Sequence, residues 1–153
     1  MSVLRERIKQ RKFDDLAHEA ILSLMVTANQ LKEKQNDFCE ETGISLQHFN
    51  ILRILKGKYP DGHPRCEIAE RMIDGSPDIT RLVDKLVRSG LVKRVKSTQD
   101  MRQSVAVITE QGIKLLDKLN QEIEQFGIAF KKTLGEDDLK RIVSICDKIL
   151  RMV

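Results

Sequence analysis

Apolar residues recur at steps of three and four residues along the first part of the chain, between positions 13 and 38. This spacing predicts an amphipathic helix over 13–38. Gly43 is expected to end that pattern, and Ser45 is suited to cap a shorter helix after it. The apolar face of the shorter helix consists of Phe49, Leu52 and Leu55.

Turn-forming residues divide the middle of the chain. All three prolines fall between positions 60 and 77, and the stretch GKYPDGHP combines two glycines with two prolines, which predicts a loop. A helix is expected over about 67–73. A second helix opens at Ser76 as its N-cap, with Pro77 at the first helical position, and stops at Gly90. One face of this second helix is apolar and consists of Ile79, Leu82, Val83, Leu86 and Val87.

Two short segments with β-forming, partly alternating patterns follow, over 91–96 and 104–109, and predict a hairpin. Thr109 is suited to cap a long helix, which Gly135 breaks before a final helix begins. Both of these C-terminal helices carry an apolar stripe. The pattern as a whole predicts a mainly α protein with a small β component (α+β), in which a helix, a turn, a helix and a hairpin lie between long terminal helices.

The composition limits the class of protein. The chain has 153 residues, which suits one domain or one compact subunit, and 41% of them are hydrophobic. Tryptophan is absent and tyrosine occurs once, so aliphatic side chains must fill the core. No apolar run approaches the ~18 residues of a membrane span, and no apolar segment typical of a signal peptide follows the basic N-terminus. We therefore expect a cytosolic, cytoplasmic protein.

Positive charge is concentrated on the second middle helix and the hairpin. The net charge of +4 is only a mild bias, but the stretch 76–102 alone contains seven Lys or Arg residues and three Asp residues. The excess in this stretch equals the entire net charge. A basic surface on one part of the chain favours a partner with negative charge, such as nucleic acid.

Several motifs occur in fixed order along this region. They are ITRLVDKLVRSGLVKR at 79–94, DMR at 100–102 and VITEQG at 107–112. On these motifs, and with its long flanking helices, the chain resembles the MarR family of bacterial transcription regulators over nearly its full length. Ile108 departs from the family pattern, which has leucine there. The resemblance implies a winged helix-turn-helix whose second helix enters the major groove while the hairpin, or wing, lies over the neighbouring backbone.

The resemblance also implies a division of the chain. A single MarR-like subunit would span 1–153, with a winged-helix DNA-binding part at 46–109 and dimerisation helices at 13–38 and 110–153. The terminal helices have more apolar surface than one small core can bury, which agrees with a homodimer. A two-fold dimer would place its recognition helices ~34 Å apart on a pseudo-palindromic operator. We expect a repressor that is released by a ligand which changes this spacing.

Candidate DNA contacts follow from the same resemblance. Arg102 of the wing would enter the minor groove, and Asp100 would orient an arginine, with Arg94 as a second possible partner. Asp78 either serves the helix N-terminus or accepts from a cytosine amine, and Asp84 is expected to be structural. An Asp-x-Arg pair alone would be a surface ion pair worth up to ~1 kcal/mol, but the preceding helix pair favours DNA contact. The full set of candidates is Ser76, Pro77, Asp78, Thr80, Arg81, Lys85, Lys96, Ser97, Asp100 and Arg102.

The effector is expected to be a small molecule, since related regulators often take phenolic or other small aromatic anions. Candidate lining residues are His18, Met25 and Phe49, which are explained just as well as core residues. Two alternatives stay open. One is a redox-switched regulator that uses Cys39 or Cys66. The other is a winged-helix protein–protein interaction module that does not bind DNA, against which the basic segment argues.

The three cysteines are too few and too far apart for a disulfide framework. Cys39 is followed by two glutamates, which raise a thiol pKa and blunt reactivity. Cys66 has a basic neighbour but is expected to pack within its helix, and Cys146 lies on an apolar stripe and is expected in the core.

Other chemistry has little support. His63 and Cys66 have a His-x-x-Cys spacing, but a metal site needs three or four ligands and no second cluster is apparent. Phosphate-binding loops, a nucleophile elbow and a His-Glu pair are all missing from the sequence. We therefore expect neither a cofactor nor an enzyme.

Overall fold

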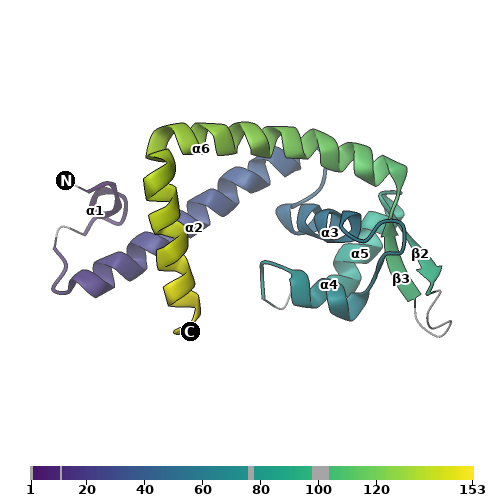
Figure 1. The fold of residues 1–153 in the computed structure, drawn as a ribbon, viewed down its shortest axis with the longest axis horizontal. Coiled ribbons are helices and arrows are strands. Elements are labelled where there is room, and N and C mark those ends of the chain that lie inside the picture. Colours follow the sequence, from purple (N-terminus) through teal and green to yellow (C-terminus); the bar gives the residue numbers. More distant parts are fainter. Residues whose placement is uncertain (1, 11, 76–77, 98–103) are drawn as a thin grey trace.

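The computed structural model describes residues 2–10, 12–75, 78–97 and 104–153 of the chain. Its elements, in chain order, are α1 (Val3–Arg7), α2 (Leu16–Glu40), α3 (Leu46–Lys56), β1 (His63–Pro64), α4 (Arg65–Arg71), α5 (Ile79–Arg88), β2 (Val92–Lys96), β3 (Ser104–Ile108) and α6 (Glu110–Leu150). Two parts are evident in Figure 1. We call α3, α4, α5, the sheet and the first turns of α6 the lobe, and α1, most of α2 and the rest of α6 the arm. This is the mainly α winged-helix architecture with long terminal helices that the sequence predicts.

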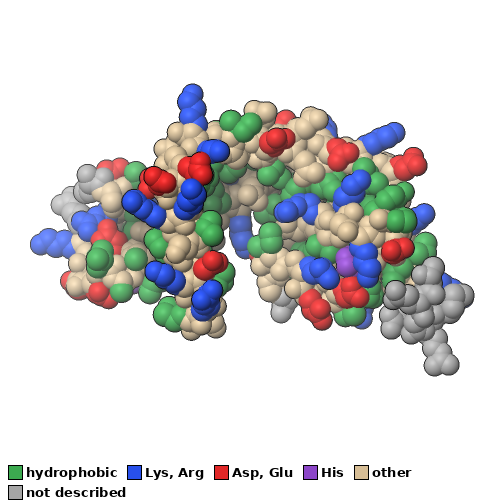
Figure 2. All heavy atoms as spheres, in the orientation of Figure 1, with side chains coloured by type: hydrophobic (Ala, Val, Ile, Leu, Met, Phe, Trp, Pro, Cys, Tyr) green, Lys and Arg blue, Asp and Glu red, His purple; other side chains and the backbone are tan. Residues whose placement is uncertain are grey.

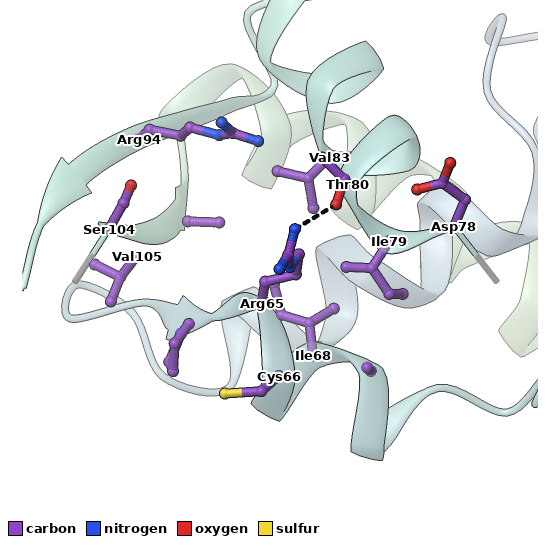
Figure 3. A pocket seen from close by; sticks show the side chains of 13 residues that line it. Arg65, Cys66, Ile68, Asp78, Ile79, Thr80, Val83, Arg94, Ser104 and Val105 are labelled. Carbon is purple, nitrogen blue, oxygen red and sulfur yellow. Dashed lines mark hydrogen bonds between the residues drawn. The ribbon is translucent and has the colours of Figure 1, made fainter. Parts of the chain in front are cut away.

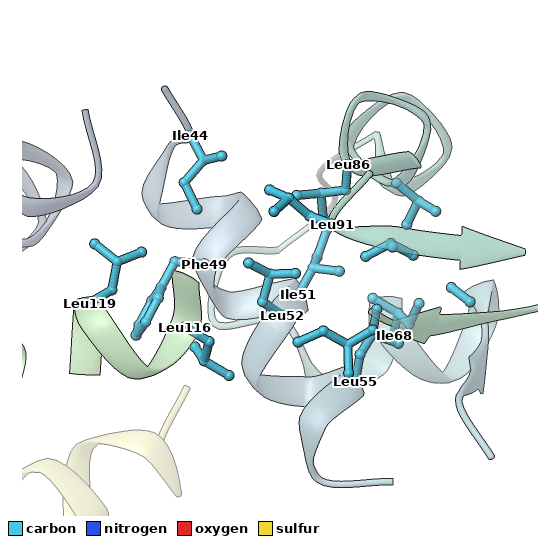
Figure 4. Packing of buried hydrophobic residues seen from close by; sticks show 14 of the residues in the cluster. Ile44, Phe49, Ile51, Leu52, Leu55, Ile68, Leu86, Leu91, Leu116 and Leu119 are labelled. Carbon is cyan, nitrogen blue, oxygen red and sulfur yellow. The ribbon is translucent and has the colours of Figure 1, made fainter. Parts of the chain in front are cut away.

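An apolar core around α3 holds the lobe together. Leu52 and Leu55 of α3 are completely buried. They lie between Ile68 of α4 and Leu86 of α5 on one side and Leu116 of α6 on the other (Figure 4). The first turns of α6 therefore belong to the lobe by packing, although the division of the sequence at residue 110 assigns them to the dimerisation helices.

The sheet of the lobe is antiparallel, with strand order β1-β3-β2. Val92 to Lys96 pair with Ile108 to Ser104, which gives the predicted hairpin. On the other edge of β3, His63 lies opposite Ala106. The sequence pattern did not predict β1, because two residues are too few to leave an alternating pattern.

The start of α6 is fastened to the turn that follows α5. Thr109 Oγ1 accepts from the Gly112 N–H (3.1 Å), as predicted for an N-cap, and donates to the Gly90 carbonyl (2.7 Å). The Thr109 N–H donates to the Leu91 carbonyl (3.0 Å). A Cβ at Gly112 would lie 2.2 Å from the Leu91 carbonyl oxygen, so only glycine allows the helix to approach this closely.

Gly135 turns α6 sharply, as Figure 1 shows. Its backbone has φ +75° and ψ +167°, in a region that residues with a Cβ rarely adopt. The prediction that Gly135 separates two helices is therefore confirmed, although α6 continues on both sides of the bend.

The helices of the arm bury few side chains, in contrast to the elements around the core of the lobe. Of α2, only Cys39 near its end is buried, and no residue of α6 beyond Leu119 is buried. Hydrophobic side chains lie uncovered on both helices (Figure 2). The large ones are Leu16, Ile21, Leu24, Met25, Ile128, Ile142, Val143, Ile145 and Leu150.

The N-terminal end of the arm contains α1, a short helix that the sequence analysis missed. Arg5 binds both carboxylate oxygens of Glu19 at 2.8 Å, and its guanidinium lies 5.7 Å from the ring centre of Phe13. The hydrogen bond from Arg5 lowers the pKa of Glu19. Contacts with Phe13 and α2 thus hold this end of the chain. The sequence pattern did not predict α1, because contacts between residues far apart in the chain leave no local periodicity.

Helix boundaries differ from the predictions by a few residues. The predicted helix over 13–38 begins at Leu16, because Asp15 caps it by accepting from the Ala17 N–H (3.1 Å). The helix expected over 67–73 is α4, which starts two residues earlier and ends at Arg71. In the described part of the chain, no helix combines the length and the apolar character that a membrane span requires.

Candidate nucleic-acid interface

The second helix of the helix-turn-helix, α5, begins at Ile79. The Asp78 carboxylate caps it by accepting from the Arg81 N–H (3.1 Å). The prediction of Ser76 as N-cap with Pro77 at the first helical position is therefore wrong, because aspartate is as good an N-cap as serine and lies next to the helix. Ser76 and Pro77 lie outside the described residues. Of the two roles considered for Asp78, the geometry favours service to the helix N-terminus.

The two faces of α5 differ in chemistry. Its inner face packs on the lobe core through Ile79, Val83 and Leu86. Its outer face exposes the basic side chains Arg81, Lys85 and Arg88. Spacings of four and three residues place these cations along one exposed side of the helix, where they repel each other unless an anion lies between them.

Two arginines from neighbouring elements form hydrogen bonds to side chains of α5. Arg94 Nη2 on β2 is 2.7 Å from Asp84 Oδ1, which agrees with the structural role predicted for Asp84. Both side chains are nearly half exposed, so this ion pair contributes at most ~1 kcal/mol and serves mainly to orient the groups. The alternative partner suggested for Arg94, Asp100, lies outside the described residues.

The second arginine, Arg65, comes from α4. Its Nη1 donates to Thr80 Oγ1 at 2.7 Å. Sequence reasoning missed Arg65, because fifteen residues separate it from Thr80 and no periodic pattern connects them. The one available signal was general, namely that the first helix of a helix-turn-helix crosses the DNA backbone.

A pocket of about 660 Å³ lies between α4, α5 and the sheet (Figure 3). Arg65 and Thr80 line it from one side and Arg94 and Ser104 from the other. Its apolar lining includes Ile68, Val83 and Val105. The pocket therefore combines an apolar surface with two guanidinium groups directly beneath the N-terminal half of α5.

The wing is described only in part. Lys96 is exposed at the end of β2, opposite Ser104, and Ser97 after it is half-buried. Asp100 and Arg102 lie outside the described residues. The roles predicted for all four wing residues therefore stay predictions.

The three residues considered for an effector pocket do not share a site within one chain. Phe49 is only 2% exposed and belongs to the lobe core, where the Arg53 guanidinium lies 5.8 Å from its ring centre. His18 and Met25 are exposed on α2, and His18 packs edge-on against Phe13. Of the two roles considered for Phe49, pocket lining and core packing, its burial supports core packing.

The cysteines have three different environments. Cys39 is completely buried, and burial raises the pKa of its thiol to about 11. Its low reactivity was predicted, but the cause is burial and not the neighbouring glutamates. Cys66 is exposed and Cys146 is half-buried in the arm. Both packing predictions are therefore wrong, since α4 turns Cys66 outward and the arm has no core within one chain.

His63 is buried and engaged by a carboxylate. Its Nδ1 lies 2.6 Å from Glu67 Oε2, and this hydrogen bond lowers the pKa of Glu67. Lys58 Nζ is 3.7 Å from the same oxygen. Across the described residues, no three His, Cys, Asp or Glu side chains gather as metal ligands.

Comparisons with known proteins agree with this geometry. The sequence profile of the MarR family matches residues 44–104, from just before α3 to the start of β3. The HTH-type transcriptional regulator MhqR of Bacillus subtilis (strain 168) is 28% identical over 123 residues, which are 80% of this chain and 81% of that protein. A MarR transcription factor from Planctomyces limnophilus, known from its crystal structure, is 32% identical, with a TM-score of 0.66 over 89% of this chain and 98% of its own. The chain belongs to the MarR family.

As a MarR-family protein, the chain is a transcriptional regulator and not an enzyme, and its winged helix binds DNA. Helix α5 is the recognition helix, and β2 and β3 form the wing. The S. aureus MepR–DNA complex has the same fold, with a TM-score of 0.77 over 93% of this chain and all of the MepR chain, at 20% identity. Such a low identity supports the shared fold alone.

Proposed function

We propose that this MarR-family protein is a homodimer that represses transcription by occupying a pseudo-palindromic operator. One observation carries the proposal: the same chain has a basic outer face on α5 and an arm with exposed apolar side chains. Two arms related by a two-fold axis would bury these side chains against each other. The two α5 helices would then reach successive major grooves ~34 Å apart.

In this proposal the chain divides by role. Residues 46–109 form the DNA-binding part, while residues 13–38 and the C-terminal helical segment 110–153 form the dimer, apart from the first turns of α6 that pack in the lobe. Thr80, Arg81 and Lys85 contact the major groove and its phosphates. The wing contacts the neighbouring backbone through Lys96 and Ser97 and the minor groove through Arg102, which Asp100 orients.

Release is proposed to follow from a small aromatic anion. A ligand shifts the equilibrium only if it binds one spacing of the α5 helices better than the other. The hollow between arm and lobe in Figure 2 is one place for it. The pocket beneath α5 is another, because an anion there would draw Arg65 and Arg94 away from α5.

A thiol switch is the second candidate for regulation, and exposure favours Cys66 for it over Cys39. Cys66 is exposed and lines the pocket beneath α5, whereas Cys39 is buried with a raised pKa. Alkylation with N-ethylmaleimide should then weaken DNA binding by the wild type and leave Cys66→Ser unaffected. Equal affinity before and after alkylation would remove this candidate.

The proposal is tested by fluorescence anisotropy with a labelled duplex from upstream of the protein's own gene, across a salt series. We expect tight binding that falls steeply with salt, because phosphate contacts release counterions. Arg81→Ala and Arg102→Ala should each weaken it. An unrelated duplex is the control for sequence preference.

The stoichiometry decides the dimer part of the proposal. Two chains per duplex, and loss of tight binding when one half-site is scrambled, are the expected results. Equal weak binding to both duplexes would place the operator elsewhere in the genome, which a genome-wide selection would find. Absence of binding to any duplex at low salt would contradict DNA-based repression and favour a protein–protein module.

A further inference from the structure

We propose that Arg65 is a contact to the DNA backbone and that Thr80 holds its guanidinium in position for that contact. The inference rests on the DNA-binding function proposed above. It adds a residue on α4, outside the recognition helix and the wing, to the surface that meets DNA.

The position of Arg65 is fixed by a bond between the two helices of the helix-turn-helix. Arg65 is the first residue of α4, and its exposed side chain reaches across to the second residue of α5 (Figure 3). Its Nη1 donates to Thr80 Oγ1 at 2.7 Å. In proteins of this architecture the N-terminal residues of the recognition helix approach the bases, and the first helix crosses the backbone. The bond therefore places the guanidinium at the end of α5 that enters the groove.

Among the described residues Arg65 has no ion-pair partner, unlike Arg5 and Arg94. Arg5 is paired with Glu19 and Arg94 with Asp84. Arg65 instead binds a neutral hydroxyl, and no described carboxylate lies within ion-pair distance of it. Asp78, which lines the same pocket, caps α5 by accepting from the Arg81 N–H and forms no ion pair with Arg65. An exposed positive charge that pairs with no described carboxylate, next to the recognition helix, attracts a phosphate.

The donors of Arg65 are also sufficient for both roles. A guanidinium has five N–H groups, and the bond to Thr80 takes one of them. The remaining donors suit the oxygens of a phosphate, which arginine binds in a bidentate manner. Because Thr80 already restrains the side chain, less conformational entropy is lost on binding than for a free arginine.

A contact of this kind has a specific signature. Phosphate contacts position a protein without reading sequence, so their loss weakens binding to all duplexes by a similar factor. It also lowers the slope of log affinity against log salt by about one. A base contact, by contrast, changes the preference between sequences.

The test compares Arg65→Gln with Arg71→Gln, which removes the same charge from the other end of α4. Full-length proteins are titrated onto operator and unrelated duplexes across a salt series, after far-UV circular dichroism has established equal helix content. We expect Arg65→Gln to weaken binding about tenfold on both duplexes and to reduce the salt slope by about one. Arg71→Gln should change affinity less than about twofold.

Thr80→Val separates positioning from charge. On the unrelated duplex, Thr80→Val should weaken DNA binding when it is made in the wild-type protein. It should have little further effect in the Arg65→Gln background, because on this duplex Thr80 contributes through Arg65. If Arg65→Gln keeps the affinity and salt slope of the wild type on an operator that the wild type binds, Arg65 is not a contact and the repressor proposal still stands. Equal losses for Arg65→Gln and Arg71→Gln would also overturn the inference, since they would reflect general electrostatics. If the wild type binds no duplex, both proposals fall together.

Discussion

The lobe and the arm are built from the same kinds of residue but bury their apolar side chains to different extents. In the lobe, short helices and a sheet surround α3, and the apolar side chains of the core between them are almost entirely removed from water. In the arm, longer helices carry comparable side chains that stay open, such as Met25 at 57% and Val143 at 61% exposure. A chain that completes one core and leaves a second apolar surface open is incomplete as a single copy. The lobe is therefore a finished domain, whereas the arm leaves open the apolar surface that the proposed dimer would cover.

A charge placed on the apolar surface of the arm should have the largest effect, because it should dissociate the proposed dimer. Ile145→Asp puts a carboxylate on the apolar stripe that also includes Ile142 and Ile149. Burying it without a partner is costly, so the dimer dissociation constant should rise on the order of 100-fold or more. Sedimentation equilibrium measures the change, and operator affinity should fall with it.

Ser144→Glu is the matched control for this change. It adds the same charge one residue away, about 100° around the helix, where the side chain is exposed and polar. It should leave the dimer intact. Dissociation by both variants, or by neither, would mean that this stripe is not the interface.

Two glycines of α6 allow the same substitution to be compared in the lobe and in the arm. An alanine Cβ at Gly112 would lie 2.2 Å from the Leu91 carbonyl oxygen and 2.7 Å from Ile108 Cγ1, so Gly112→Ala should lower the free energy of unfolding by about 1–3 kcal/mol. At Gly127 no atom lies within 4 Å, and Gly127→Ala should raise it by up to ~1 kcal/mol through helix propensity. Urea denaturation measures both. If the two variants change stability in the same direction, the lobe is not packed more closely than the arm at these positions.

Lowering the pH should reduce the stability of the lobe because of His48. Burial, and to a smaller extent Lys85, lowers the pKa of this histidine below its ordinary value of 6.5. Below that pH the unfolded chain binds a proton that the folded lobe does not, so stability falls as the pH falls, by at most ~1.4 kcal/mol per pH unit. His48 Nδ1 accepts from the Ser45 N–H (3.2 Å), and Nε2 is buried without a hydrogen-bond partner among the described residues.

The measurement is urea denaturation at pH 7.5 and 5.5. His48→Gln is the comparison, because glutamine can keep the capping interaction with Ser45 but does not titrate. The wild type should lose more stability than the variant between these two pH values. An equal loss would assign the pH dependence to other groups.

The smallest expected effect concerns an ion pair between the two parts. Lys32 of α2 is paired with Asp74 in the turn between α4 and α5. The lysine is about half exposed, so Lys32→Met should cost no more than ~1 kcal/mol, and added salt should reduce the difference. A double-mutant cycle with Asp74→Asn measures the coupling. A value indistinguishable from zero would mean that this pair does not link the arm to the lobe.

Much of the lobe could be predicted from the sequence because its signals are local. Periodicity located α3 and α5, Thr109 and Gly135 marked the start and the bend of α6, and strands β2 and β3 have the predicted pairing. The errors arise where two local signals compete. Ser76 and Asp78 are both good caps, and only the folded geometry shows that Asp78 is used.

The site was predictable only in part, because side chains meet through tertiary contacts. The basic outer face of α5 followed from helical periodicity. The bond from Arg65 to Thr80 and the pairing of Arg94 with Asp84 did not, because α4 and β2 are brought to α5 by the core. Exposure was equally hard to predict, since Cys39 is fully buried in one chain whereas Cys146, on an apolar stripe of α6, is not.

Helix α6 belongs to both parts, and this has a mechanical consequence. Between Thr109 and the bend at Gly135 it is a rod of roughly 37 Å, at 1.5 Å per residue. A tilt of about 5° at the bend moves the other end by roughly 3 Å, which is close to the ~3.4 Å step of the double helix. Thr109 passes that displacement to the turn behind α5. A change of only a few degrees at this bend would thus displace a recognition helix by about the height of one base pair.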